Sequence, residues 1–440
     1  MPEEPEHGCR STRPQPARRG SYSVAVEAES ERHSPNGRDG RLITRTDLNE
    51  RITEWGIRED VVEKDYVIGW ALWGIGADPV LSALWAFKGG TCLKKCYVET
   101  YRFSEDLDFT VLPGGPGEPG QVIPLLKTVL DRVYEESGID FQARDPVMRV
   151  RPDGRSAEGR IYYRGPRNAP GVASIRIDLT VAEQVVRPTV LRPIAHEYPD
   201  SLPSPAEVRC YSFEEAFAEK LRAMGERARP RDLYDIITLY RRSAVLPDAD
   251  VILAVYREKC ESKGVDVFTG ESIQASPFLR ELEDEWDNML GHQLPALPPF
   301  SALWGVLPRL YEWLEGTRPM ERLAPIPTNE ELDDSWSPPP TVSLWGPRVP
   351  VEEMRFAAAN HLRVELDYQG STHMIEPYSL RKTRSGQLKL YAVESETGEI
   401  ASYALDQIQS IRVSGTSFTP RFVVDVPGTG LMPRQVRSGD

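Results

Sequence analysis

Two acidic residues, Asp106 and Asp108, have the type and spacing that metal-assisted chemistry requires. On a strand, residues i and i+2 point the same way, so both carboxylates would face one side while Leu107 and Phe109 face the core. Two neighbouring carboxylates repel each other and are costly to bury unless a cation neutralises them. Mg²⁺ does so with carboxylate oxygens and water, and phosphoryl and nucleotidyl transfer use such metals. A lone D-x-D pattern arises often by chance, so it needs support from elsewhere in the chain.

A glycine-rich segment, Gly89-Gly90-Thr91, lies upstream of this acidic pair between an expected strand and an expected helix. Glycines let a backbone approach a phosphate closely, and the N-terminus of the following helix offers unpaired N–H groups and the positive end of its dipole. The Thr91 hydroxyl adds a donor, and Lys88 and Arg102 supply positive charge nearby in sequence. The segment therefore suits a phosphate, although an ordinary strand–helix turn has the same composition.

A third carboxylate, Asp178, lies in the segment 174–181, where apolar and polar residues alternate strictly. Such alternation predicts a half-buried strand, on whose polar face Asp178 lies together with Arg176 and Thr180. A third carboxylate would complete the usual metal site, so Asp178 is our candidate third ligand beside the acidic pair. The alternative is an exposed edge position with no role in binding.

Hydrophobic spacing predicts the elements that must position these residues. They are strands at 84–87 and 107–111, helices at 91–97 and 121–137, and two or three strands within 140–186. Helical spacing then continues from Phe213 to about Gly316. The sequence thus predicts an α/β core followed by a helical bundle.

Composition limits the class of protein. The chain has 440 residues and lacks an apolar run of the ~18 residues that a membrane span requires, so we expect several domains and no membrane contact. Its five cysteines form no C-x-x-C pair, and its N-terminus lacks the apolar core of a secretory signal, which favours the cytoplasm. Cys92 and Cys96 are expected to be packing residues. With a formal net charge of −14, the chain must bind any nucleic acid through a local basic patch.

Four stretches carry a resemblance to a known family: VVEKDYVIGWAL, FKGGTCLKK, YRFSEDLDF and AFAEKLRAMGERARPRDLYDI. A strand, a GG-T turn, a helix, a D-x-D strand and a distant acidic strand residue together resemble the polymerase-β-type nucleotidyltransferase superfamily. The four stretches look most like the AbiEii/AbiGii family of toxin nucleotidyltransferases, over roughly residues 45–315. Fifteen residues separate Gly90 from Asp106. That gap is longer than is common in the superfamily and predicts an extended loop.

This resemblance implies roles for the candidate residues. Asp106 and Asp108, with Asp178, would bind Mg²⁺ or Mn²⁺, and an NTP would be the substrate. The nucleotide-binding set comprises Lys88, Gly89, Gly90, Thr91, Arg102 and Arg231. The catalytic set comprises Asp106, Asp108, Lys220 and Asp232, of which Asp232 lies with Asp235 in the family's last motif.

Two of these assignments have alternatives. Without the resemblance, Lys220 would be a surface lysine on an amphipathic helix, with its charged end in water. The cluster of Arg227, Arg229 and Arg231 either binds phosphate or an RNA backbone or forms a solvated loop.

The chain changes character after a proline-rich stretch at 317–349, which is expected to be a linker. A helix and short strands follow, and VELDYQG, IEPYSLR, GQLKLYAVESETGE, YALDQIQSIRV and FTPRF resemble a WYL-type domain, an SH3-like β-barrel with an N-terminal helix. The eponymous triplet reads Leu388-Lys389-Leu390, and Tyr403 and Gln407 replace usual basic residues. Such domains bind ligands or nucleic acid and regulate attached modules. Four basic residues either serve that role or form a solvated hairpin: Arg381, Lys382, Arg384 and Lys389.

The expected fold class is α+β, with a polymerase-β-type nucleotidyltransferase α/β core, a helical bundle and a small C-terminal SH3-like β-barrel. The expected divisions are a disordered tail at 1–41, a catalytic domain at 42–210, a helical domain completing the active site at 211–316, the linker at 317–349 and the barrel domain at 350–440.

The leading hypothesis is an enzyme that transfers a nucleotide from an NTP to an acceptor. The resemblance implies the 3′ end of a tRNA as acceptor, growth arrest in a toxin–antitoxin or phage-defence setting as the outcome, and a cognate antitoxin protein as partner. The alternative is a regulatory sensor whose barrel binds a nucleic acid or second messenger while the front domain only binds nucleotide. A third possibility is a protein or small-molecule acceptor. The intact acidic pair, which a pure binding module does not need, favours the enzyme.

Overall fold

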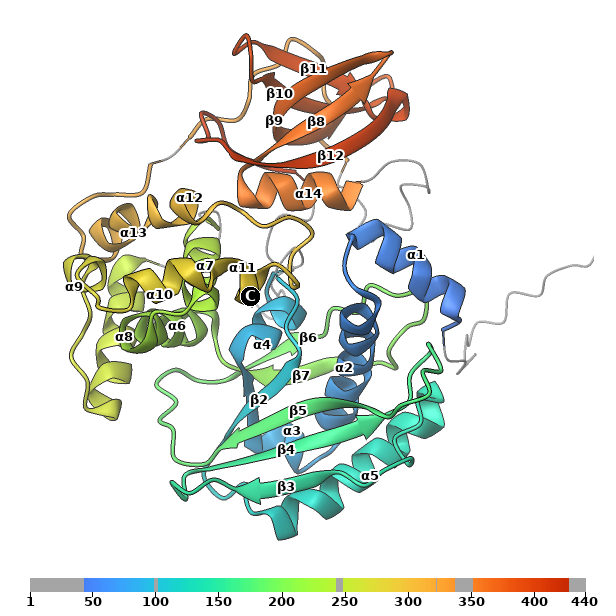
Figure 1. Cartoon of the computed structure of the whole chain (residues 1–440), viewed down its shortest axis with the longest axis vertical. Helices are drawn as coiled ribbons and strands as arrows, with labels where there is room; N and C mark the ends of the chain where they lie inside the picture. Colours follow the sequence, from blue (N-terminus) through green and yellow to red (C-terminus); the bar gives the residue numbers. More distant parts are fainter. Residues whose placement is uncertain (1–42, 99–101, 243–247, 322, 337–350, 427–440) are drawn as a thin grey trace, which may run out of the picture. The chain divides into compact units, whose positions relative to one another are not determined.

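The structure, a computed structural model, describes residues 43–98, 102–242, 248–321, 323–336 and 351–426 (Figure 1). The tail expected at 1–41 lies outside these residues. Among the residues described, no helix has the length and apolar character needed to cross a membrane. The chain forms one sheet before residue 211 and a second after residue 361, with a series of helices between them in sequence.

The first sheet has seven strands in the order β3-β4-β5-β2-β1-β7-β6. They are β1 (Trp85–Lys88), β2 (Asp106–Val111), β3 (Val147–Val150), β4 (Ser156–Tyr163), β5 (Ala173–Thr180), β6 (Val190–Pro193) and β7 (Glu207–Cys210). β2 runs parallel to β5 and β1 parallel to β7, while the other neighbours are antiparallel. The strands expected at 84–87, at 107–111 and within 140–186 are confirmed.

Alternation along the central strands separates a core face of the sheet from an open face. Leu107 and Phe109 on β2 and Ile177 on β5 are fully buried, so the polar residues between them lie on the opposite face. The core face shares one apolar core with helices α2 (Glu59–Ala77) and α5 (Pro119–Ser137). Because these helices take up the apolar face, the acidic residues of the strands remain on the face available for chemistry.

Shorter helices complete this part of the molecule. They are α1 (Arg45–Trp55), α3 (Leu81–Leu84) and α4 (Gly89–Cys96). The last of them, α4, leaves β1 directly at the glycine pair, so the chain passes from strand to helix without a loop. The helices expected at 91–97 and 121–137 are therefore both present, and the first begins two residues earlier than expected.

A helical region follows β7, as expected. Its elements are α6 (Phe213–Arg227), α7 (Pro230–Tyr240), α8 (Ala249–Lys263), α9 (Gly270–Gln274), α10 (Leu279–Asp284), α11 (Trp286–Leu290), α12 (Phe300–Trp304) and α13 (Leu307–Leu314). Between α6 and α7 the chain reverses sharply, because Ala228 adopts a left-handed conformation at φ 43° and Pro230 starts the next helix. This turn brings Arg227, Arg229 and Arg231 to one place.

The second sheet has five antiparallel strands in the order β11-β10-β9-β8-β12. Helix α14 (Val351–Asn360) precedes it, and its strands are β8 (Leu362–Tyr368), β9 (Ser371–Lys382), β10 (Leu388–Glu394), β11 (Ile400–Ala404) and β12 (Ile408–Ser417). In the described part of the chain, the edge strands β11 and β12 do not pair, so the structure shows a sheet rather than the closed barrel that we expected.

Part of the stretch expected to be a linker packs on this second sheet. Ile326 is buried in a small core with Tyr378 and Tyr391, and isolated bridges join Pro325 and Leu332 to residues beyond the linker. The acidic residues of this segment pair with the expected basic stretch: Arg384 with Glu331 at 2.9 Å, Lys389 with Glu330 at 2.6 Å, and Lys382 with Asp333 at 3.8 Å. These contacts explain why the basic stretch is not a freely solvated hairpin.

Candidate active site

Three carboxylates lie together on the open face of the seven-stranded sheet. Asp106 and Asp108 are on β2, two residues apart, and Asp178 is on the neighbouring parallel strand β5 at the register position opposite Asp108. All three line a cavity of about 570 Å³. The structure therefore brings together the three residues that we proposed as metal ligands.

The glycine pair packs closely against side chains of the same cavity. Gly89 has φ +78°, a conformation that favours glycine, and a Cβ atom there would lie 2.3 Å from Oδ2 of Asp108. A Cβ atom on Gly90 would lie 2.6 Å from Nη2 of Arg102. Both positions therefore exclude a side chain, and the backbone at the start of α4 forms part of the cavity wall.

Thr91 has a different place from the one expected. Its side chain is buried, and its hydroxyl donates a hydrogen bond of 2.5 Å to the backbone oxygen of Asp106. Thr91 thus fixes the start of β2 against α4, and the structure does not place it among the residues lining the cavity.

The electrostatics around Asp108 favour a cation. Burial, together with the charges of Asp106 and Asp178, raises the pKa of Asp108 to about 6 against the lowering effect of Lys88 and Lys220. A carboxylate that is costly to ionise beside two others is stabilised by a bound cation. The oxygen ligands match the preference of Mg²⁺ and Mn²⁺. The donor set thus fits a divalent metal.

Asp178 differs from the other two carboxylates because arginines already pair with it. Its Oδ1 lies 2.8 Å from Arg151 and its Oδ2 lies 3.1 Å from Arg176. Burial nevertheless raises its pKa above the ordinary value. Any metal bound by Asp178 must share that carboxylate with the two arginines.

The opposite wall of the cavity comes from α6 and α7. Lys220 on α6 donates to the fully buried carboxylate of Asp235 on α7 at 2.7 Å. Arg102 binds the same carboxylate through two hydrogen bonds of 2.8 and 3.0 Å. Although burial opposes ionisation, the charges of Arg102 and Lys220 hold the pKa of Asp235 well below its usual range. Asp235 therefore positions both basic residues at the cavity.

Asp232 has a similar positioning role. It is fully buried and accepts two hydrogen bonds, of 2.8 and 2.9 Å, from the guanidinium of Arg227. Arg231, one residue earlier, has a buried Nε that makes no hydrogen bond within the described residues. Burial and the charge of Arg102 lower the pKa of Arg231. A bound anion would supply the partner that this guanidinium lacks.

Lys88 lines the cavity, and its ammonium group is already paired. It pairs with Glu183 and, at 3.5 Å, with Glu219. Although burial opposes it, the charges of these two carboxylates raise the pKa of Lys88. Lys259 extends the network, 3.2 Å from Glu219. Sequence reasoning missed this network because its members lie on four separate segments, and each alone resembles a surface residue.

The cavity as a whole is basic, unlike the chain. Eight basic and five acidic side chains line it, in a protein whose formal net charge is −14. An excess of cations in a concave site favours polyanionic ligands. The arrangement therefore suits phosphate groups near a bound cation.

Three cysteines form a separate buried group that does not line the cavity. The Sγ atoms of Cys92, Cys96 and Cys210 lie within 4.8 Å of one another. Among the described residues no fourth histidine, cysteine or carboxylate joins them, and a structural zinc site normally has four ligands. The three buried thiols fit the packing role that was expected for Cys92 and Cys96.

Comparison with known proteins bears on this geometry. The family model of the nucleotidyl transferase AbiEii toxin, type IV toxin–antitoxin system, matches residues 70–315. The solved structure of MenT4, a nucleotidyltransferase toxin from Mycobacterium tuberculosis H37Rv, is similar at 19% identity and a TM-score of 0.45, covering 62% of this chain and 90% of that chain. No curated protein matches the chain. The family match spans more than half of the 440 residues and includes both walls of the cavity.

Proposed function

The chain belongs to the AbiEii family of nucleotidyltransferase toxins of type IV toxin–antitoxin systems, and on this premise we propose its reaction. The family implies that the protein is a nucleotidyltransferase with an NTP substrate and an antitoxin partner. We propose that it transfers a nucleotide from the NTP, with Mg²⁺ or Mn²⁺, to a hydroxyl of RNA, namely the 3′ end of a tRNA.

One observation carries this proposal: three carboxylates share one face of adjacent strands, and the pKa of Asp108 among them is raised to about 6. Asp106 and Asp108 would hold the metal, with Asp178 as the third ligand. A divalent cation here would neutralise phosphate charge and make a bound hydroxyl more acidic. The glycine turn brings the backbone at the start of α4 into the cavity wall, in close contact with Asp108 and Arg102.

The helical wall suits the triphosphate. Lys220 is held at the cavity by Asp235, and Arg231 has a buried donor that makes no hydrogen bond in the described part of the chain. Arg227 and Arg229 line the same wall. We assign the β- and γ-phosphates to these cations, which would stabilise the charge that accumulates on the leaving pyrophosphate.

The proposed chemistry is a single displacement at phosphorus. The acceptor hydroxyl oxygen forms a bond to the α-phosphorus while the bond from that phosphorus to the bridging oxygen breaks. Pyrophosphate leaves with the electron pair of the broken bond, and the hydroxyl proton passes to one of the three carboxylates. The chain's residues bind the NTP, align the acceptor hydroxyl with the α-phosphorus and neutralise phosphate charge, as phosphoryl transfer requires.

We also propose that residues 351–426 form a WYL-like module. An N-terminal helix followed by five antiparallel strands supports this. The basic stretch that was expected to contact a ligand instead pairs with Glu330, Glu331 and Asp333. The sensor hypothesis therefore has less support than the enzyme, because three of its four candidate basic residues already pair with carboxylates of this chain.

The test is to incubate purified protein with each labelled NTP and total RNA, in the presence of Mg²⁺ or Mn²⁺. We expect label in tRNA from at least one NTP and none with Asp106→Ala. Labelling of a protein instead of RNA would identify another acceptor. Equal labelling by Asp106→Ala would show that the acidic pair is not the metal site and would overturn the proposal.

A further inference from the structure

An arginine pair lies on the same open face as the catalytic carboxylates, farther along the sheet. In the strand register, Asp106 on β2 is followed across the sheet by Arg176 on β5, Arg160 on β4 and Val147 on β3. Neighbouring strands lie about 4.8 Å apart, so Arg160 is about 10 Å from the strand of Asp106. The row leads from the metal ligands to the edge of the sheet.

Two arginines directly opposite each other are an unfavourable cross-strand pair. Arg176 is partly compensated by Glu158 at 3.4 Å and Asp178 at 3.1 Å. Arg160 is exposed, and its guanidinium donates a hydrogen bond of 3.0 Å to the hydroxyl of Ser174. Within the described residues, no carboxylate pairs with Arg160. An anion bound between Arg160 and Arg176 would relieve their repulsion.

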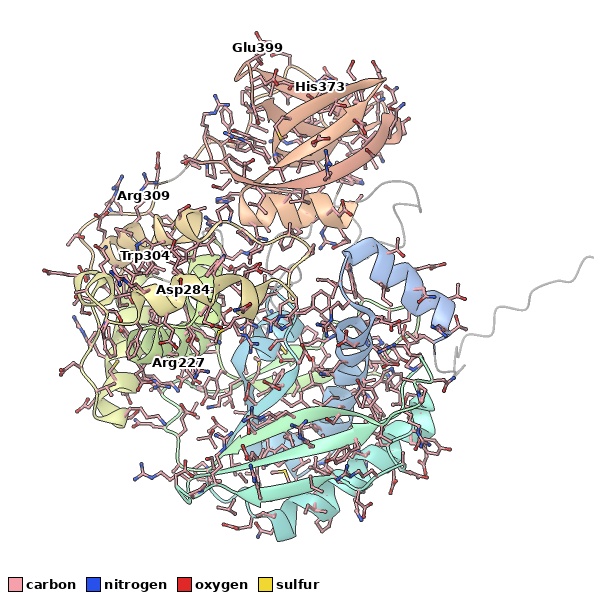
Figure 2. The ribbon with its side chains drawn as sticks, in the orientation of Figure 1. Arg227, Asp284, Trp304, Arg309, His373 and Glu399 are labelled. Carbon is pink, nitrogen blue, oxygen red and sulfur yellow. The ribbon has the colours of Figure 1, made fainter. Side chains whose placement is uncertain are left out.

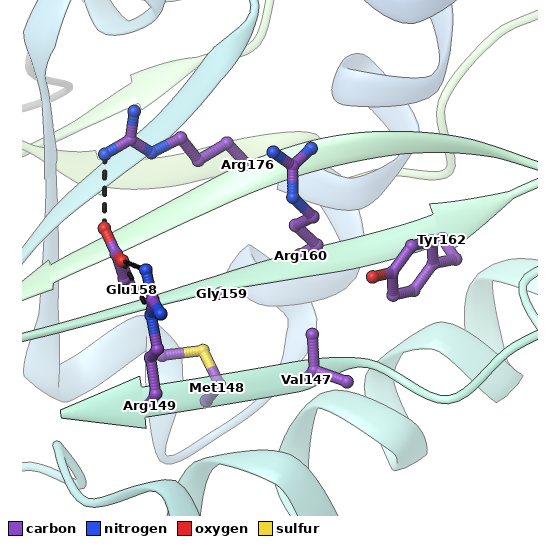
Figure 3. A pocket seen from close by; sticks show the side chains of 8 residues that line it. All are labelled: Val147, Met148, Arg149, Glu158, Gly159, Arg160, Tyr162 and Arg176. Atoms are coloured by element: carbon purple, nitrogen blue, oxygen red, sulfur yellow. Dashed lines mark hydrogen bonds and ion pairs between the residues drawn. The ribbon is translucent and has the colours of Figure 1, made fainter.

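These side chains surround a hollow of about 500 Å³ (Figure 3). Figure 3 shows Arg160 and Arg176 side by side on β4 and β5, with Glu158 and Tyr162 at either end of the group. Three arginines and one glutamate line the hollow, in a chain of net charge −14. Its charge therefore complements a polyanion.

An aromatic group lies at the end of the hollow that is farther from Glu158. The guanidinium of Arg144 lies 4.1 Å from the ring centre of Tyr162, and Tyr162 shares its face of β4 with Glu158 and Arg160. Stacked arginines and tyrosines are the groups on which unpaired RNA bases stack. Tyr162 itself is buried, so the hollow offers phosphate contacts through its arginines, while the exposed guanidinium of Arg144 beside it offers a plane for a base.

Arg176 belongs to this hollow and also to the active-site cavity. We infer that the open face of β3, β4 and β5 is the docking surface for the RNA acceptor, whose phosphate backbone crosses Arg160 and Arg176 on its way to the three carboxylates. The single-stranded 3′ end then enters the cavity from the sheet side. This inference rests on the proposed function and assigns it a substrate path.

The basic side chains of the cavity lie in two groups, one on each wall. The helical wall carries Lys220, Arg227, Arg229 and Arg231, while the sheet side carries Arg151 and Arg176. The three carboxylates lie on the sheet strands that end at the same cavity. Donor and acceptor would therefore approach the metal ligands from different walls, as displacement at phosphorus requires.

The test compares Arg160→Ala with Arg309→Ala in the full-length protein. Arg309 is an exposed arginine on α13 (Figure 2) and lines neither the hollow nor the active-site cavity. With total tRNA and the preferred NTP, Arg160→Ala should raise the KM for tRNA roughly fivefold and leave the KM for NTP unchanged, because one phosphate contact is lost. The slope of log Kd for tRNA against log salt should fall by about 1. Arg160→Lys should restore most of the affinity, and Arg309→Ala should change neither constant.

Several outcomes would overturn the inference. If the wild type labels tRNA and Arg160→Ala leaves the KM for tRNA and the salt dependence of tRNA binding unchanged, the assignment of the docking surface is wrong. The proposed function then still stands. If Arg160→Ala raises the KM for NTP instead, the hollow serves the triphosphate. If the wild type labels no RNA while transferring nucleotide to another acceptor, the proposed RNA acceptor is wrong, and this inference falls with it.

Discussion

Asp108 and Asp178 occupy the same register position on two neighbouring parallel strands, so their carboxylates share one face with no strand between them. Their proximity depends on the pairing of β2 with β5, which the sequence between the two residues does not reveal. Helices on the core face hold the two strands in place, so the carboxylates cannot move apart and their repulsion lowers the stability of the folded protein. A bound cation would relieve this repulsion and stabilise the folded state.

The first prediction concerns stability and pH. Because the folded-state pKa of Asp108 is raised to about 6, the contribution of this group to stability is complete below its unfolded-state pKa and is lost as pH rises through 6. Asp108→Asn should therefore stabilise the metal-free protein at pH 8 by roughly 2–3 kcal/mol and have little effect at pH 4. Urea unfolding at both pH values measures this. A variant less stable than wild type at pH 8 would contradict it.

The second prediction distinguishes the catalytic role of Lys220 from the structural role of Asp235. Asp235→Asn leaves Arg102 and Lys220 next to a neutral buried group and should cost about 3–5 kcal/mol of stability. Lys220→Met leaves the pair of Arg102 and Asp235 intact, so it should keep the fold and slow nucleotide transfer by ~100-fold or more. Thermal unfolding and transfer rates measure both effects. Equal loss of stability in the two variants would mean that Lys220 is structural.

The third prediction concerns the glycine turn. Gly89→Ala places a methyl group 2.3 Å from Asp108 and should abolish transfer. Gly114→Ala is the matched control, because Gly114 has φ +85° and no atom within 4 Å of its added Cβ. Both variants carry the same backbone strain, of about 1 kcal/mol, and only Gly89→Ala should lose metal binding. Calorimetric titration with Mn²⁺ distinguishes them, and equal affinities would refute the close contact.

The fourth prediction concerns Arg231. If its guanidinium binds the triphosphate, Arg231→Gln should raise the KM for NTP about tenfold and leave the KM for tRNA unchanged. The pattern is the reverse of that expected for Arg160→Ala, so the two variants together test the assignment of the two walls. Arg309→Gln is the control. If Arg231→Gln changed only the KM for tRNA, Arg231 would contact the acceptor, and its assignment to the triphosphate would be wrong.

Sequence reasoning found the residues whose local pattern reveals them. Alternation along β2 and β5 placed Asp106, Asp108 and Asp178 on polar faces, and the glycine pair marked the turn before α4. It could not find that Thr91 bonds the backbone of Asp106, because that contact depends on the exact packing of α4.

The sequence also did not predict which charged residues pair over long distances along the chain. Arg102 was expected to bind nucleotide and does line the cavity, but its bonds to Asp235, 133 residues later, were not foreseen. Asp232 was expected near the chemistry and does line the cavity, but its bond to Arg227 was not foreseen. A single sequence shows which residues are charged, whereas the choice of partner depends on how helices turn onto the sheet. The barrel expectation failed similarly, because strand periodicity does not fix whether edge strands pair.

The most direct test of the central claim compares wild type with Asp106→Asn in single-turnover transfer of radiolabelled nucleotide to total tRNA in Mg²⁺. Asp106→Asn keeps the shape of the side chain and removes one charge from the proposed metal site. The account predicts unchanged thermal stability within a few degrees and a rate lower by on the order of a thousandfold, partly recovered by raising the metal concentration. Rates that agree within about twofold would contradict the assignment of the three carboxylates as the metal site of a nucleotidyltransferase.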